Sequence, residues 1–265
     1  MKLINSKVEL IQQPKGLLGV YKQIELCGRT CYKSEDNITN DSCTRFVNAM
    51  VKNKHTAMLE HGTVYLTVPV TSDDDSTALG IYYKYKINPY SKVVYHDNNY
   101  YITTNYRVIV ENSWDGDLKY LSEPSFHIKR YCFRITCNRI QSQSICRHRH
   151  FSFAQESTRY CNYSKDKFNH EICFVLPELY TKNENYEELL KNAEQTYFKL
   201  IEQGWKAESA RDVLPNALKT EICVTGFEDD WAHFLDLRYR ETTGKAHPDM
   251  KAIATKINKI LEENE

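Results

Sequence analysis

Apolar residues recur every three or four positions in several segments of the chain, and this spacing predicts amphipathic helices. We expect helices over residues 20–31, 39–54, 185–203, 208–214 and 230–238, and a last helix that begins at His247-Pro248-Asp249. Gly28 is expected to end the first of these helices and Gly204 the third. Asp229 is expected to cap the helix over 230–238, and Asn138 to cap a further helix that runs toward Arg147.

Alternating apolar and polar residues predict strands elsewhere. The alternation is clear over residues 62–70 and 128–137, a short apolar run covers 172–176, and the Tyr-rich part of the chain is strand-prone at 93–96 and 100–110. These elements predict an α/β (α+β) fold in which one domain, residues 1–265, holds a largely antiparallel sheet flanked by helices. Residues 72–125 are expected to form a strand-rich elaboration of that domain.

The composition narrows the classes of function. The 265 residues include 35 basic and 35 acidic side chains, and this zero net charge counts against a dedicated nucleic-acid binder. The sequence shows no signal-peptide pattern and no apolar run of the roughly 20 residues that span a membrane. We therefore expect a soluble, cytoplasmic protein that binds neither nucleic acid nor membranes. Its cysteines form no CxxC pair, which indicates reduced thiols, and the absence of GxGxxG argues against a Rossmann site.

The densest cationic stretch runs from Arg147 to Tyr160. Arg147 and Arg149 offer rigid forks of N–H donors that suit phosphate and carboxylate groups. His148 between them can donate or accept a hydrogen bond near neutral pH. Aromatic side chains in the same stretch could stack on a flat ring. This combination favours an anionic, planar ligand such as a nucleotide, although such a run also occurs as a solvated face beside aromatic core residues.

Two motifs in the chain resemble those of a known family. Arg147-His148-Arg149, followed after seven residues by Ser157-x-Arg159-Tyr160, resembles the signature of the flavin-dependent thymidylate synthases. The stretch from His55 to His61 resembles the family sequence His-x-Ser-x-x-Glu-His, with Ala57 in place of the serine that helps to hold flavin. The two histidines could instead form a metal pair. No companion cluster of cysteine or carboxylate lies at ligand spacing, so we expect no metal site there.

The resemblance implies that the protein methylates dUMP to dTMP. It implies FAD as the bound cofactor, methylenetetrahydrofolate as the one-carbon donor, NADPH as the reductant, and a homotetramer with sites formed where subunits meet. In that chemistry the flavin carries the hydride, and the protein binds, orients and polarises. The alternative from a different class is a non-enzymatic nucleotide- or RNA-binding module that uses the Arg-rich, aromatic stretch.

The resemblance also assigns individual residues to the site. Flavin would be bound by Arg147, His148, Arg149, Gln155, His233 and His55, and dUMP by Ser144, Arg147, Gln155, Glu156, Ser157, Thr158, Arg159, Arg211 and Arg238. Arg238 is expected to be catalytic, because a fixed cation beside the uracil ring would stabilise negative charge that develops there. Gln155 stands where many members have Glu, and Ser144 stands where members often have Gln or Glu.

Simpler explanations exist for some of these residues. Arg211 could form a salt bridge with Glu208 one helical turn away, and Arg238 could be a cation that interacts with a helix C-terminus. Cys146 and Cys161 flank the signature, and a neighbouring arginine could lower the pKa of Cys146. We nevertheless expect neither cysteine to be a nucleophile, because a Pro-Cys-His context is absent and buried cysteine is the commoner state of an intracellular thiol.

Overall fold

The computed structural model of the chain describes residues 1–72 and 74–264, so that Asp73 and Glu265 lie outside the described residues. Its strands are β1 (Lys2–Ile4), β2 (Lys7–Ile11), β3 (Thr63–Pro69), β4 (Lys92–His96), β5 (Asn99–Asn105), β6 (Arg130–Asn138), β7 (Ser152–Gln155), β8 (Cys173–Val175) and β9 (Lys219–Phe227). Its α-helices are α1 (Gly16–Tyr32), α2 (Ser42–Lys52), α3 (Ser76–Lys86), α4 (Tyr106–Glu111), α5 (Arg139–Ile145), α6 (Glu184–Glu202), α7 (Ala207–Ala210), α8 (Glu228–Arg238) and α9 (Pro248–Glu262). Two 3-10 helices also contribute to the sites below, η2 (Thr56–His61) and η5 (Arg211–Val213).

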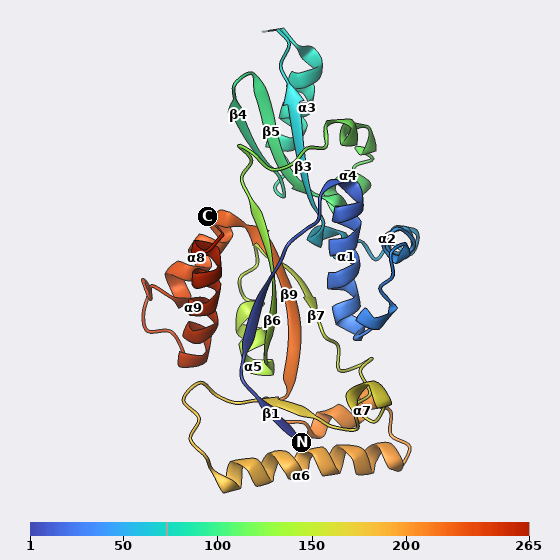
Figure 1. The fold of residues 1–265 in the computed structure, drawn as a ribbon, viewed down its shortest axis with the longest axis vertical. Helices are drawn as coiled ribbons and strands as arrows, with labels where there is room; N and C mark the ends of the chain where they lie inside the picture. Colours follow the sequence, from blue (N-terminus) through green and yellow to red (C-terminus); the bar gives the residue numbers. More distant parts are fainter. Residues whose placement is uncertain (73, 265) are drawn as a thin grey trace.

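Four strands form the central sheet in the order β2-β6-β9-β7, and every neighbouring pair is antiparallel. Helices lie on both sides of this sheet (Figure 1): α1 on one side, and α8 and α9 on the other. Phe133 and Val224 of the sheet pack against Trp231, Phe234 and Ile253 of α8 and α9. This arrangement confirms the predicted α/β (α+β) class with a largely antiparallel sheet flanked by helices.

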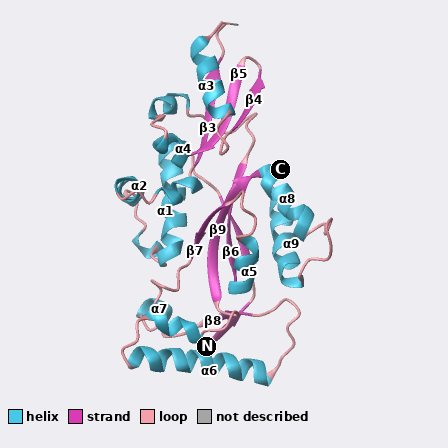
Figure 2. Cartoon of the chain, turned by 180° about the vertical axis from the view of Figure 1, so that it is seen from behind, coloured by secondary structure: helices cyan, strands magenta, loops and turns pink. Residues whose placement is uncertain are grey.

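Two smaller sheets lie at opposite ends of the central one (Figure 2). The antiparallel sheet β3-β5-β4 packs against α3, and the parallel pair β1-β8 lies beside α6. Residues of the expected elaboration at about 72–125 form α3, β4, β5 and α4, and Asp73 within that range is outside the described residues. The assignment of residues 1–265 to a single domain stays a prediction.

Helix α1 does not end at Gly28 as expected but continues to Tyr32. Gly28 is buried, and a Cβ at this position would lie 2.5 Å from the ring of Phe46 in α2. The glycine therefore permits close helix packing rather than ending the helix. Termination occurs at Lys33, which adopts the left-handed conformation with a φ of 48°.

The prediction of a strand over 100–110 is wrong beyond Asn105. The Asn105 side chain accepts a hydrogen bond from the backbone N–H of Val108 at 3.1 Å, and it thereby caps α4. Valine and isoleucine in α4 favour extended backbone, but the cap and the burial of Ile109 select the helix. Helix α3 also lies in the Tyr-rich segment, where no helix was expected.

Asp229 does not cap α8, which begins one residue earlier, at Glu228. The carboxylate of Asp230 instead accepts a hydrogen bond from the backbone N–H of Phe227 at 3.1 Å. The helix predicted over 208–214 is divided into α7 and η5, and Leu214 is extended because it precedes Pro215. The remaining predicted helices, and the strands over 62–70, 128–137 and 172–176, are confirmed with small shifts at their ends.

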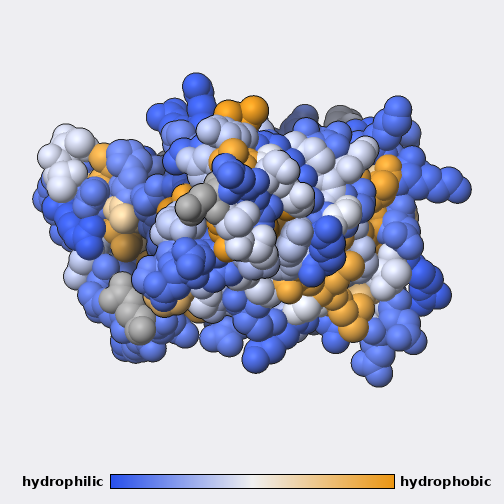
Figure 3. Space-filling model, turned by 90° about the horizontal axis from the view of Figure 1, so that it is seen from above, coloured by the Kyte–Doolittle hydropathy of each residue, from blue (hydrophilic) through white to orange (hydrophobic). Residues whose placement is uncertain are grey.

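The surface of the molecule is mainly polar at the end where α3 lies. Viewed from there, its hydrophobic residues form small, separate groups among hydrophilic ones (Figure 3). Within residues 1–72 and 74–264, no helix has the length and apolar character needed to cross a membrane.

Candidate ligand-binding site

A pocket of ≈ 560 Å³ forms where the turn after α5 meets α8. Helix α5 begins with a capping box in which Asn138 and Gln141 bond to each other's backbone N–H groups, and it ends at Ile145. The chain then turns through the Arg-rich motif into β7. Strand β9 continues directly into α8, which contributes the opposite wall. The pocket is lined by Arg147, His148, Arg149, His150, Phe151, Asp230, His233, Leu237 and Arg238.

His148 and Arg238 touch across this pocket. The Arg238 Nε–H donates to His148 Nε2 at 3.4 Å, and the imidazole lies edge-on to Phe234 with ring centroids 4.9 Å apart. Burial, together with the charges of Arg238 and His233, lowers the pKa of His148 to about 4. His148 is therefore neutral at neutral pH, with Nε2 as acceptor and the proton on Nδ1. This contact fixes the direction of the Arg238 side chain.

Arg147 and Arg149 present two further cations to the same pocket. Both side chains are exposed, and within residues 1–72 and 74–264 neither guanidinium forms a hydrogen bond or an ion pair. Arg149 also lines an adjoining pocket of ≈ 810 Å³, whose acidic wall includes Asp230 and Asp229, the latter paired with Lys92. Two unpaired guanidinium forks beside an open cavity are suited to an anionic ligand.

A second group of predicted residues lies beyond the other end of β7. Arg211 of η5 donates from Nη1 to the Thr158 Oγ1 at 3.1 Å, and Arg159 donates from Nε to Glu208 at 3.0 Å. The Ser157 Oγ accepts a hydrogen bond from the backbone N–H of Arg159 at 3.3 Å. The salt bridge between Arg211 and Glu208 that the sequence allowed is therefore not formed, because Arg159 takes the Glu208 carboxylate.

Gln155 and Glu156 are adjacent in the chain, but they bond to different groups of residues. Gln155 uses its amide nitrogen internally, donating to Ser142 at 2.9 Å and to Thr220 at 3.1 Å. Glu156 is 2% exposed and accepts from Lys219 Nζ at 2.9 Å. It lines a separate pocket of ≈ 320 Å³, where Lys219 also bonds Glu221 at 2.7 Å.

The charged groups that line this separate pocket strongly affect one another's pKa values. Burial lowers the pKa of Lys219, but the charges of Glu156 and Glu221 outweigh it and raise that pKa above its usual value. Burial would raise the pKa of Glu221, but Lys219 and Lys33 lower it to about 2. Lys219 and Glu221 are therefore both charged at neutral pH, and their charges offset each other.

The remaining predicted residues lie apart from the ≈ 560 Å³ pocket. Ser144 is half-buried on α5, and His55 is exposed just before η2. An activated thiol has a lowered pKa, but the pKa values of Cys146 and Cys161 are raised. Burial raises the pKa of Cys146, and burial together with Glu156 raises the pKa of Cys161 to about 12. The expected effect of a neighbouring arginine on Cys146 is outweighed by burial.

Four residues that line the ≈ 560 Å³ pocket were not expected there from the sequence: His150, Phe151, Asp230 and Leu237. His150 and Phe151 belong to the recognised motif and could have been included for that reason. Asp230 lies three residues before His233, so a helix from Glu228 to Arg238 places both on one face. Leu237 gave no signal, because an apolar residue in an amphipathic helix is normally assigned to the core.

Comparison with known proteins identifies the family. Residues 122–264, more than half of the chain, match the family described as thymidylate synthase complementing protein. A flavin-dependent thymidylate synthase of Thermococcus onnurineus is 33% identical over 133 residues, which cover 49% of this chain and 52% of that protein. One of Pyrococcus furiosus is 36% identical over 125 residues, 46% of this chain and 49% of that protein. The chain thus spans about half the length of the curated relatives it matches.

Among solved structures, a UMP/dUMP methylase from Streptomyces cacaoi bound with 5-Br dUMP aligns with a TM-score of 0.46 and 15% identity, over 99% of this chain and 93% of the other. The matched segment of the family, residues 122–264, contains both walls of the ≈ 560 Å³ pocket. The resemblance noted in the Arg147–Tyr160 motif is thereby confirmed, and the chain belongs to the thymidylate synthase complementing protein family.

Proposed function

We propose that this protein methylates dUMP to dTMP, with FAD as bound cofactor, methylenetetrahydrofolate as one-carbon donor and NADPH as reductant. One observation carries the proposal: Arg147, His148 and Arg149 meet His233 and Arg238, about 85 residues later in the chain, around one pocket. The relatives described as flavin-dependent thymidylate synthases support the same activity.

The pocket residues fit a flavin nucleotide. The two unpaired guanidinium forks of Arg147 and Arg149 suit a pyrophosphate, and the apolar Phe151 and Leu237 suit a flat ring. The two adjoining pockets share Arg149 and Asp230, so one extended ligand could reach both. When bound, FAD would supply the hydride chemistry, and the chain would bind, orient and polarise.

Arg238 is the catalytic residue in this proposal. Its guanidinium is a planar fork of N–H donors, and His148 Nε2 accepts a hydrogen bond from its Nε–H at 3.4 Å. Because its pKa is lowered to about 4, His148 is neutral and accepts that bond. It therefore adds no positive charge beside the Arg238 guanidinium. A cation held in this way would stabilise negative charge that develops on a uracil ring. We propose no cysteine nucleophile, because burial raises the pKa of both Cys146 and Cys161.

Assembly of a homotetramer is part of the proposal. Within one chain, the group around Arg147 and the group around Ser157, Arg159 and Arg211 lie beyond opposite ends of β7. Four residues of strand extend on the order of 13 Å, which is long for one nucleotide to bridge with both groups. Sites formed where subunits meet would bring one group of each copy beside the other group of its neighbour.

The test uses the full-length chain. We expect the purified protein to bind FAD and to form dTMP from dUMP when methylenetetrahydrofolate and NADPH are supplied. Arg147→Ala and Arg149→Ala should each weaken FAD binding by about 10- to 150-fold, the value of one charge-assisted hydrogen bond. Arg240→Ala is the matched control, because Arg240 is exposed and pairs with Asp236 at 2.8 Å, outside the pocket lining.

Three results would contradict the proposal or a part of it. A folded wild-type chain that neither binds FAD nor forms dTMP would exclude the activity. Salt-sensitive retention of RNA by the same flavin-free protein would favour the nucleotide- or RNA-binding alternative. A monomer that binds FAD and turns over would exclude the shared-site assembly and leave the reaction in place.

A further inference from the structure

Two cysteines and a histidine that are far apart in the sequence meet inside the molecule. Cys27 lies on α1, His61 ends η2, and Cys132 lies on β6. One ligand atom from each residue lies within 4.8 Å of the other two, and all three residues are buried. The two sulfur atoms of Cys27 and Cys132 are 3.7 Å apart. The cluster lies on the α1 side of the central sheet, away from the ≈ 560 Å³ pocket that Arg147 lines, called the Arg147 pocket below.

His61 has a ring nitrogen available for a ligand. Its Nδ1 lies 2.8 Å from the Thr225 Oγ1, and its Nε2 is buried without a hydrogen-bond partner in the described part of the chain. One ring nitrogen is thus oriented by a hydroxyl, as is common for histidine that binds a metal ion.

The cysteine geometry fits a tetrahedral ion. Two thiolates bound at about 2.3 Å with tetrahedral angles would place their sulfurs roughly 3.8 Å apart, close to the 3.7 Å between Cys27 and Cys132. Cys223 lies beside Cys27 in the same buried group and contacts Thr30 Oγ1 at 3.6 Å, but its sulfur is not among the ligand atoms that lie within 4.8 Å of one another, so its side chain would have to move to become a fourth ligand. Three thiols and an imidazole are donors typical of a structural zinc site.

A nearby cation could balance the charge of such a site. A divalent ion with three thiolates and one neutral imidazole has a net charge of −1. The Arg130 side chain lies half-buried close by, and it bonds the Glu60 carbonyl at 3.2 Å and the Thr63 Oγ1 at 3.3 Å. Within residues 1–72 and 74–264 it forms no ion pair with a carboxylate, and its Nε atom is buried without a hydrogen-bond partner. A cation that is partly removed from water and lacks a paired anion is destabilising, and a negatively charged metal site would offset part of that cost.

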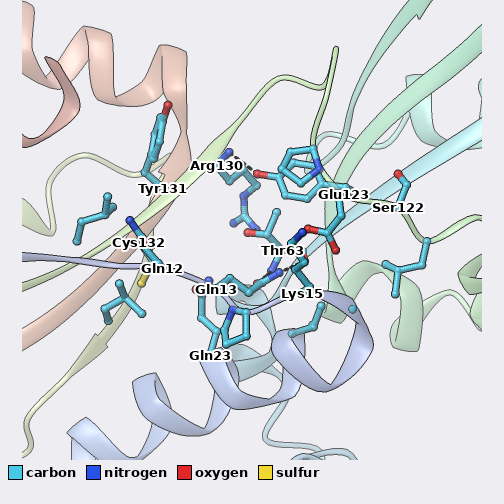
Figure 4. Close-up of a pocket in the computed structure, with 18 of the residues that line it drawn as sticks. Gln12, Gln13, Lys15, Gln23, Thr63, Ser122, Glu123, Arg130, Tyr131 and Cys132 are labelled. Atoms are coloured by element: carbon cyan, nitrogen blue, oxygen red, sulfur yellow. Dashed lines mark hydrogen bonds between the residues drawn. The ribbon is translucent and has the colours of Figure 1, made fainter. Parts of the chain in front are cut away.

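One residue of the cluster borders a pocket. Cys132 lines a pocket of ≈ 290 Å³ together with Gln13, Gln23, Thr63 and Arg130 (Figure 4). We propose that Cys27, His61 and Cys132, joined by Cys223 after a shift of its side chain, bind one zinc-class divalent ion that ties α1 and η2 to the central sheet. Binding would release the three thiol protons to solvent, so that each sulfur binds as a thiolate. No metal was expected at His55 and His61 from the sequence, because no companion cysteine lies near them in the chain.

The first experiment measures metal content. The full chain would be purified without chelators under reducing, anaerobic conditions, and its metals quantified by mass spectrometry. We expect about one zinc ion per chain. Cys27→Ser and Cys132→Ser should lose it, whereas Cys137→Ser should retain it. Cys137 is the matched control because it is also buried on β6 but lies in a different hydrophobic cluster. Cys223→Ser should bind zinc more weakly, and unchanged affinity would exclude Cys223 as the fourth ligand.

A second measurement does not depend on the folding of variants. Metal-free wild-type protein would be titrated with Co²⁺, and tetrahedral thiolate coordination should give ligand-field bands and sulfur-to-cobalt charge-transfer absorption that added Zn²⁺ abolishes. Three results would overturn the proposal: a folded wild type with neither metal nor a cobalt spectrum, full zinc content in both Cys27→Ser and Cys132→Ser, or a disulfide between Cys27 and Cys132 in place of the ion.

Discussion

Charged side chains lie at both ends of β7, but in the described part of the chain they are unpaired at one end and form ion pairs at the other. Before the strand, Arg147 and Arg149 are exposed and, within the described chain, unpaired. After it, Glu156 is buried and bonds Lys219, which also bonds Glu221. Paired buried charges neutralise one another and hold the strand ends together, whereas unpaired exposed cations remain available to a ligand. Pairing therefore gives the buried Glu156 and Lys219 a structural role, whereas the guanidinium groups of Arg147 and Arg149 stay open to the pocket.

The largest expected effect lies at the paired end. Lys219→Met should lower the free energy of unfolding by about 3–5 kcal/mol, because it leaves the buried Glu156 carboxylate without its cation. Urea denaturation measures this change. The control is Lys259→Met. Lys259 is exposed and forms a long surface ion pair with Glu263 at 3.9 Å, so this substitution should lower the free energy of unfolding by less than about 1 kcal/mol. Equal effects of the two substitutions would contradict the distinction between the two ends.

At the unpaired end, the expected effect is on binding. Arg238→Ala should weaken dUMP affinity by about 10- to 150-fold and reduce dTMP formation, while FAD reduction by NADPH stays near the wild-type rate. Arg238→Lys should recover only part of the loss, because a point charge lacks the planar fork. Titration with dUMP and stopped-flow reduction measure the two quantities. Unchanged dUMP affinity together with unchanged dTMP formation would leave Arg238 as a cation at the end of α8.

A pH titration examines His148 in the same pocket. The pKa of His148 is about 4 in the folded protein, against the usual 6.5 of a histidine in an unfolded chain. Between these pH values the unfolded chain binds a proton that the folded chain does not, so the free energy of unfolding falls as the pH falls from 6.5 to 4. Because His148 is only partly buried, its share should be on the order of 1–2 kcal/mol.

The comparison with His148→Gln isolates that share, because buried His61 titrates in the same direction in both proteins. Chemical denaturation at several pH values should show a shallower loss of stability for His148→Gln on acidification. Parallel stability curves for the two proteins would show that the His148 imidazole is solvated in the folded state.

The smallest effect is expected for the exposed pair of Arg159 and Glu208. Glu208→Gln should change the free energy of unfolding by less than about 1 kcal/mol, as is usual for a surface ion pair. Releasing Arg159 should also tighten dUMP binding, by at most about 5-fold. Denaturation and ligand titration measure both. Weaker dUMP binding would show that Glu208 orients Arg159 for the ligand instead of competing for it.

The sequence predicted those parts of the molecule whose signals are local. The residues Arg147–Phe151 are consecutive, so one turn brings them together, and their motif led to the pocket. The central strand β9 was missed, because the buried residues from Ile222 to Phe227 do not alternate with exposed ones. Such a strand cannot be told from a core helix by periodicity alone.

Contacts between segments that are distant in the sequence could not be predicted, because they leave no local pattern in the chain. Nothing near His61 in the chain indicated that Cys27 and Cys132 would lie beside it, since α1, η2 and β6 meet only after the sheet has formed. The pairing of Arg159 with Glu208, in place of Arg211, likewise depends on how η5 packs near the end of β7.

Strand β9 passes into α8 without an intervening loop, since it ends at Phe227 and the helix begins at Glu228. The other wall of the Arg147 pocket leads into β7, whose Ser152 is paired with Thr225 of β9. Both walls are thus attached to one strand in the interior of the sheet. Backbone amides of β9 should exchange slowly with solvent deuterium, and the pocket cannot widen unless that ladder opens. Adaptation to different ligands therefore has to come from side-chain rotamers such as those of Arg147 and Arg149.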